Sequence, residues 1–143
     1  MKLALCNEVL QPLPFDRQCA LAASQGYAAL EVAPFTLTDD PFTLDEAAAH
    51  RARATAQAHG LSISSLHWLL VKPAGLSLVS PDAALRRRTL DLLTRLIGFA
   101  AACGAQVLVH GSPAQRSPGA GQTVQDALGR LEEALAELAP RAV

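Results

Sequence analysis

Two histidines and a glutamate stand where short apolar runs of the chain end. His67 and His110 each follow such a run directly, and Glu31 lies next to the end of a third. Neutral imidazole is a good ligand for zinc or manganese, and it can act as an acid or a base near neutral pH. A carboxylate at the end of an apolar strand is costly to bury without a partner. These three residues are therefore candidates for a substrate-binding or metal-binding site.

Two further residues could take part in such a site. Trp68 presents an apolar ring on which a ligand can stack, and Arg116 stands in a Gly-rich loop where it can clamp a phosphate or carboxylate. Simpler roles exist for each candidate: packing for Trp68, a solvated loop position for Arg116, and structural hydrogen bonds for Glu31 and the histidines. The sequence alone leaves both readings open.

The elements that must position these residues alternate regularly along the chain. Four short apolar runs (2–6, 27–32, 61–66 and 106–109) predict strands, and four segments with helical periodicity (15–25, 44–59, 81–103 and 124–139) follow them. Such alternation predicts an α/β fold with a parallel sheet and right-handed crossovers. In these folds the chemistry lies at the carboxyl ends of the strands, where the candidates stand.

Helix starts are also marked in the sequence. Thr43 and Glu46 have the spacing of a capping box, Ser80 precedes Pro81 as a cap followed by proline at the first helical position, and Thr123 precedes the last helix. We expect helices to begin at these three places.

Length and composition bound the class of protein. A chain of 143 residues suits one domain over 1–143, and no apolar run approaches the ~18 residues of a membrane span. The N-terminus begins a strand at once, which argues against a signal peptide. Three cysteines without metal-type spacing indicate buried thiols in a reducing cytoplasm. The net charge of −1 argues against nucleic-acid binding, which needs a basic face.

Several motifs are absent from the sequence. It has no Gly-x-Gly-x-x-Gly, no Gly-x-x-x-x-Gly-Lys, no Cys-x-x-Cys and no His-Glu-x-x-His. Their absence argues against a dinucleotide enzyme, a P-loop enzyme and a zinc protease.

Three stretches together resemble one known family. They are Leu-Glu-Val-Ala-Pro-Phe at 30–35, His-Trp-Leu-Leu at 67–70, and Gly-Ala-Gln-Val-Leu-Val-His-Gly-Ser-Pro at 104–113 with Arg116 after it. In this order and spacing they resemble the xylose-isomerase-like TIM barrels, which comprise sugar and sugar-phosphate isomerases and epimerases, with endonuclease IV as a distant relative.

The resemblance implies a (β/α)8 barrel of which this chain supplies about four βα units, the N-terminal half. It implies a divalent ion (Mn, Mg, Co or Zn) whose ligands and catalytic carboxylates come mainly from later strands, past Val143. For the isomerases it implies substrate contacts by Glu31, His67, Trp68, His110 and Arg116. For the endonuclease branch it implies zinc ligation by His67 and His110.

Three functions therefore remain open from the sequence. The leading hypothesis is a metal-dependent sugar or sugar-phosphate isomerase or epimerase acting on a small sugar. The second is a DNA-repair endonuclease, which the charge balance disfavours. The third is a non-catalytic half barrel or interaction module. Because a four-stranded piece of a barrel leaves two open edges, we expect self-association or pairing with a complementary half barrel.

Overall fold

The structure is a computed structural model that describes residues 1–142. Its strands are β1 (Ala4–Cys6), β2 (Ala29–Val32), β3 (Ser62–Leu66) and β4 (Val107–Leu108), and its helices are α1 (Phe15–Ser24), α2 (Glu46–Ala58), α3 (Ala83–Cys103) and α4 (Val124–Leu138). Strand and helix alternate four times, which confirms the predicted α/β order. The expected fourth strand is shorter than predicted, because only two of its residues pair with a neighbour.

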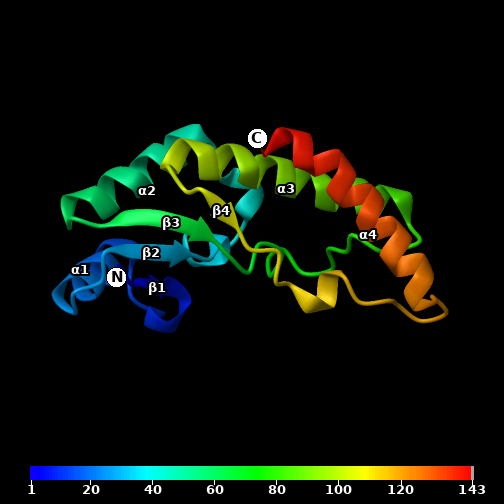
Figure 1. The fold of residues 1–143 in the computed structure, drawn as a ribbon, viewed down its shortest axis with the longest axis horizontal. Helices are drawn as coiled ribbons and strands as arrows, with labels where there is room; N and C mark the ends of the chain where they lie inside the picture. Colours follow the sequence, from blue (N-terminus) through cyan, green and yellow to red (C-terminus); the bar gives the residue numbers. More distant parts are fainter. Residues whose placement is uncertain (143) are drawn as a thin grey trace.

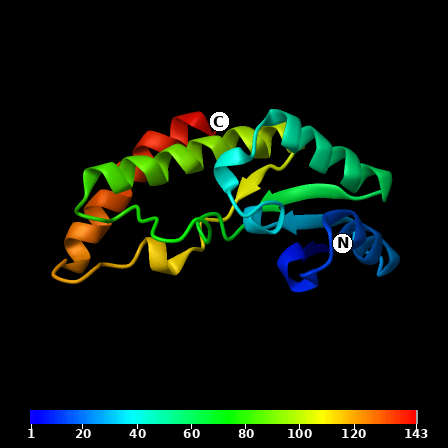
Figure 2. The same ribbon diagram turned by 180° about the vertical axis from the view of Figure 1, so that it is seen from behind.

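The four strands form one parallel sheet in the order β1-β2-β3-β4. Consecutive strands are therefore neighbours, as in an arc of a barrel and unlike a doubly wound sheet, whose strand order reverses. Figures 1 and 2 show the long α2 and α3 side by side along one side of the sheet, with α4 beyond β4. The fold is half of a (β/α)8 barrel.

A bulge in β3 sets which side chains face the helices. Leu30 pairs with Ile63, but Glu31 pairs with Ser65, so one extra residue lies in β3 between these pairs. A single-residue shift moves all following side chains to the opposite face of a sheet. Leu66 consequently returns to the buried helix side and His67 to the other face. The bulge thus places a polar residue on the inner face of the arc.

The core lies between the sheet and its helices. Leu30, Val32 and Leu66 are fully buried, and they belong to one apolar cluster with Leu96 and Phe99 of α3. Burying side chains of this size contributes about 1.5–3 kcal/mol each. Two cysteines predicted to be buried helix residues, in α1 and α3, are indeed buried and unpaired.

Two of the three predicted helix caps are wrong. Asp45, not Thr43, caps α2 by accepting from Ala48 N, because Thr43 ends a short 3-10 turn. Asp82, not Ser80, caps α3. In both places an aspartate two residues further along the chain is the N-cap instead. Thr123 caps α4 as predicted, in a capping box completed by the carboxylate three residues later.

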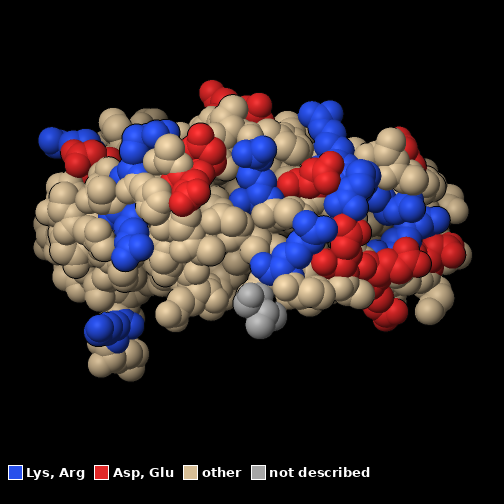
Figure 3. Space-filling model, turned by 90° about the horizontal axis from the view of Figure 1, so that it is seen from above, with Lys and Arg blue, Asp and Glu red and all other residues tan. Residues whose placement is uncertain are grey.

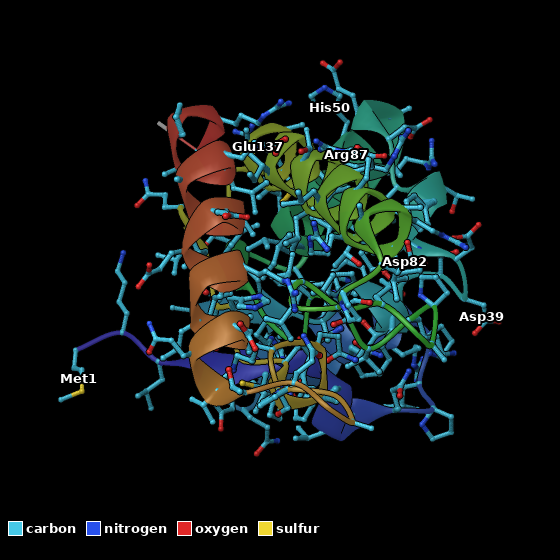
Figure 4. The ribbon with its side chains drawn as sticks, turned by 90° about the vertical axis from the view of Figure 1, so that its right-hand side faces the viewer. Met1, Asp39, His50, Asp82, Arg87 and Glu137 are labelled. Atoms are coloured by element: carbon cyan, nitrogen blue, oxygen red, sulfur yellow. The ribbon has the colours of Figure 1, made fainter. Side chains whose placement is uncertain are left out.

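The outer surface of the helical layer is charged but mixed. Figure 3 shows Lys and Arg interspersed with Asp and Glu over this face. Arg87 joins α3 to α4 by an ion pair in which its Nη1 lies 2.7 Å from Glu137 Oε1, and both residues are marked in Figure 4. This pair and the mixed field are typical of a solvated helix face. Among the described residues, no helix combines the length and hydrophobicity needed to cross a bilayer.

Candidate functional site

The carboxyl ends of β1, β2 and β3 bring four polar side chains together on the inner face. Cys6 pairs in register with Glu31, and the bulge in β3 turns His67 toward them. Cys6 Sγ lies 3.4 Å from Glu31 Oε2, and His67 Nδ1 lies 3.8 Å from Glu31 Oε1. Glu8 approaches from the other side of the imidazole. We call Cys6, Glu8, Glu31 and His67 the strand-end cluster.

His67 is the centre of this cluster. Its side chain is 8% exposed, and Nε2 lies 2.7 Å from Glu8 Oε2. A carboxylate only accepts, so Nε2 is the donor and the imidazole is held in one orientation. The other nitrogen, Nδ1, is buried and has no hydrogen-bond partner. It faces Glu31 at a distance too long for a hydrogen bond.

A buried amide network fixes the position of Glu8. Asn7 is fully buried at the end of β1, where a 3-10 turn (Asn7–Leu10) begins. Its Nδ2 donates to Gln18 Oε1 (2.9 Å) and Thr36 Oγ1 (2.6 Å), and its Oδ1 accepts from Ala33 N (2.8 Å). Helix α1 and the segment 33–36 are thereby joined to the end of β1. The turn that follows Asn7 then carries Glu8 over His67.

The thiol of Cys6 is only partly buried, but its surroundings disfavour the loss of its proton. Burial, a hydrogen bond to Glu31 and the negative charges of Glu31 and Glu8 raise the pKa of Cys6 to about 11. Cys6 is therefore a thiol near neutral pH unless a cation replaces its proton.

Trp68 lies beside the cluster in an uncommon backbone conformation. Its φ is +51°, in the left-handed region that bulky residues rarely adopt, and the residue is 45% exposed between two buried neighbours. Such strain of about 1–3 kcal/mol is often found at ligand sites. The exposed indole next to His67 offers a surface for an apolar sugar face.

His110 lies elsewhere, on the helix side of β4. Its imidazole lines an apolar hollow of about 220 Å³ together with Leu93, Ile97, Leu135 and Leu138 of α3 and α4. Both ring nitrogens are buried without a hydrogen-bond partner. Burial, and then the positive charge of Arg116, lower the pKa of His110 below its usual range. Burial in the hollow thus favours the neutral form of this imidazole.

The five candidates named from the sequence therefore fall into two groups. Glu31, His67 and Trp68 lie together at the ends of β2 and β3, whereas His110 and the exposed Arg116 lie at the end of β4. Within residues 1–142, the set of three or more metal-type ligands that come together is Cys6, Glu31 and His67. The structure does not bring His67 and His110 into one such set.

Sequence reasoning missed the contributions of the first strand. Cys6 was interpreted as a buried thiol, and neither Asn7 nor Glu8 was named as a site residue. One signal was present: a polar pair directly follows an apolar run, as at the other strand ends. The pairing of Glu8 with a histidine 59 positions away could not be seen without the fold.

A family model described as xylose isomerase-like TIM barrel matches residues 19–143. No curated protein matches this sequence.

Solved structures show the same fold. A D-psicose 3-epimerase in the presence of D-fructose superposes with a TM-score of 0.75 at 19% identity, over 99% of this chain and 48% of that one. The D-psicose 3-epimerase of Clostridium cellulolyticum H10 gives 0.74 at 19% identity, over 99% and 48%. The 3-keto-D-glucoside 4-epimerase of E. coli gives 0.69 at 15% identity, over 99% and 52%. The chain thus spans about half the length of these structures.

Proposed function

Because the chain belongs to the xylose isomerase-like TIM barrel family, we propose that it supplies the substrate-binding half of a divalent-metal-dependent sugar or sugar-phosphate isomerase or epimerase. The observation that carries the proposal is the strand-end cluster beside an exposed indole. Glu31, His67 and Trp68 offer an acceptor, an imidazole and a stacking surface at the carboxyl ends of neighbouring strands, where barrel enzymes hold their substrates.

The proposed reaction moves a proton or a hydride between adjacent carbons of a ketose or aldose. When bound, a divalent ion polarises the substrate carbonyl and hydroxyl oxygens. A carboxylate oxygen of Glu31 and the free Nδ1 of His67 can act as ligands to such an ion or accept hydrogen bonds from the sugar hydroxyls. In this proposal Glu31 and His67 orient the sugar, and the groups that move protons lie outside residues 1–143.

The remaining two candidates, Arg116 and His110, lie away from the strand-end cluster. Arg116 is exposed after β4, within electrostatic reach of His110, and it can pair with the phosphate of a sugar phosphate. The contact of His110 with the substrate stays a prediction. Its ring faces α3 and α4 and not the strand-end cluster.

Binding can be measured through the single tryptophan. Because Trp68 is the only tryptophan, fluorescence excited at wavelengths that the single tyrosine does not absorb reports on this residue alone. We expect D-fructose with Mn²⁺ to change the emission saturably and D-mannitol, which lacks the carbonyl, to change it less. His67→Gln should abolish the response, and His50→Gln, an exposed histidine on α2, should leave it intact. A saturable response that survives His67→Gln would contradict the proposal.

The open edges of the sheet support the proposed association with a second half barrel. β1 and β4 each have one neighbour, and Leu3, Val107 and Val109 next to them are 59%, 52% and 42% exposed. Unpaired strands with apolar side chains tend to pair with another chain. The occupant in this proposal is a second copy or the complementary half of the barrel.

The endonuclease alternative has a simple test. DNA affinity depends on basic residues that release counterions, and the net charge of this chain is −1. We expect no salt-dependent binding to a duplex with an abasic site in a fluorescence anisotropy titration. Binding that weakens steeply with salt would favour the endonuclease hypothesis over the sugar enzyme.

A further inference from the structure

Three different ligand types meet in the strand-end cluster at distances close to those of a metal site. Sγ of Cys6, a carboxylate oxygen of Glu31 and a ring nitrogen of His67 all lie within 4.8 Å of one another. Bonds of about 2.0–2.3 Å in a tetrahedral zinc site put ligand atoms about 3.3–3.7 Å apart. Cys6 Sγ lies 3.4 Å from Glu31 Oε2 and His67 Nδ1 lies 3.8 Å from Glu31 Oε1, so each of the two carboxylate oxygens is near that spacing from one other ligand.

The free nitrogen of His67 is a second, independent indication. Nδ1 is buried, has no hydrogen-bond partner and points toward the Glu31 carboxylate. A lone pair directed at an anion is unfavourable unless a cation lies between them. A proton on Nδ1 would not complete a hydrogen bond across 3.8 Å. A metal ion held between Nδ1 and the carboxylate would be ligated by both.

Glu8 provides the support that metal-binding histidines usually have. It accepts from Nε2 of His67 at 2.7 Å, which leaves Nδ1 unprotonated in the neutral ring and fixes the ring plane. A carboxylate behind a ligating histidine is the common outer contact of zinc sites. The buried network of Asn7 in turn holds the turn that carries Glu8.

We propose that Cys6, Glu31 and His67 form a zinc site that leaves a fourth coordination position open to the inner face of the arc. Thiolate, imidazole and carboxylate together select zinc over magnesium, calcium or manganese, which prefer oxygen ligands. Three protein ligands with an open position are the pattern of catalytic zinc sites, which bind water or a substrate oxygen in the fourth place.

Coordination requires one change in the cluster. The thiol proton of Cys6 leaves to solvent and the Cys6–Zn bond forms, without any redox step. The site shares Glu31 and His67 with the proposed sugar site and so deepens the proposed function, on which it rests. Its metal binding can nevertheless be tested without a substrate and without turnover.

Cobalt substitution tests the site directly. Co²⁺ bound to a thiolate gives a charge-transfer absorption in the near ultraviolet, and zinc displaces it. We expect this band for the whole chain, its loss in Cys6→Ser and His67→Gln, and its retention in Cys103→Ser and His50→Gln. These two controls change a buried thiol in α3 and an exposed histidine on α2. Circular dichroism checks that each variant is folded.

Two further measurements keep the proposal falsifiable if a ligand variant fails to fold. Glu8→Gln retains every ligand, and we expect it to weaken zinc binding by about 10–100-fold, as loss of an outer contact does. In the unmodified chain, zinc should slow alkylation of Cys6, the only partly exposed cysteine, as mapped by mass spectrometry. No cobalt band, a band that survives Cys6→Ser, or alkylation unaffected by zinc would overturn the proposal. The fluorescence titration with D-fructose and Mn²⁺ contains no zinc, so a saturable response there together with no cobalt band would reject the zinc site alone.

Discussion

The two edge strands of the sheet, β1 and β4, differ in the groups that surround their carboxyl ends. β1 has one neighbour, yet its end is tied by Asn7 to α1 and to the segment 33–36, and it carries a polar cluster. β4 also has one neighbour, but it has only two paired residues, and its histidine lies in an apolar hollow without a hydrogen-bond partner. At the β1 edge, the buried hydrogen bonds of Asn7 anchor the strand end in place of a second neighbouring strand. Among the described residues, the β4 edge has no comparable network.

The same contrast holds for the helices. α2 and α3 bury their apolar faces in the core, whereas Val124, Leu128 and Leu135 of α4 are 65%, 46% and 46% exposed. The helical periodicity of 124–139 places these residues on one apolar stripe, and only part of that stripe is covered. The β1 edge is thus arranged to hold polar groups in place, and the β4 edge presents apolar surface.

Breaking the network at the β1 edge should have the largest effect. Asn7→Ala leaves Ala33 N and Gln18 Oε1 buried without this partner. Each unsatisfied group costs about 1–3 kcal/mol, so we expect the free energy of unfolding to fall by about 3 kcal/mol in urea titrations. Gln25→Ala, which removes an exposed amide, should change it by less than about 0.5 kcal/mol. Equal effects of the two changes would show that the β1 edge is not specially anchored.

Replacing the buried imidazole at the β4 edge should stabilise the chain. His110→Leu removes two unpartnered nitrogens from an apolar hollow, and we expect a gain of about 1–2 kcal/mol near pH 7. The pKa of His110 is lower in the folded chain than in the unfolded chain. As the pH falls, the unfolded chain therefore binds more protons than the folded chain does. The free energy of unfolding of the wild type should therefore decrease between about pH 7 and 5 more than that of His110→Leu.

Urea titrations of both proteins across this pH range measure the difference. His59→Gln, which changes a histidine paired with Asp16 outside the hollow, serves as the control. Parallel pH profiles for wild type and His110→Leu would contradict the placement of a neutral imidazole in the hollow.

Substitutions of Trp68, whose backbone is in the left-handed region, should change the stability by a smaller amount. A Cβ at φ +51° is disfavoured by about 1–2 kcal/mol, and glycine avoids this cost. Trp68→Gly should thus be more stable than Trp68→Ala by about 1 kcal/mol or slightly less, because glycine also has more entropy in the unfolded chain. Thermal unfolding followed by circular dichroism compares the two variants. If Trp68→Ala is the more stable one, the backbone at this position is not strained.

A charge at the β4 edge should change association with little effect on the fold. Val107→Lys places a cation on an exposed apolar position, and we expect the monomer stability to change by less than about 0.5 kcal/mol. In sedimentation velocity, the wild type should sediment faster than a 15.0 kDa monomer, and the variant should approach it. Gln106→Lys adds the same charge at the adjacent polar position and should retain the association. A monomeric wild type would contradict the idea that the edges pair.

The order of strands and helices could be predicted because each element has a local signal. Apolar runs, helical periodicity and Gly104, a left-handed C-cap (φ +86°), mark them along the chain. The bulge in β3 has no such signal, although it decides that His67 faces inward. The pairing of Cys6, Glu8, Glu31 and His67 depends on register between strands far apart in sequence. Local patterns thus predicted where the candidates stand but not which of them meet.

The most direct measurement on the strand-end cluster is a histidine-selective NMR titration of the chain with a ketohexose and Mg²⁺, a diamagnetic ion. We predict that the ring resonances of His67 shift saturably while those of His110, behind the sheet, move less. A response of His110 without one of His67, or no response of either ring, would contradict the assignment of the sugar site to the ends of β1, β2 and β3.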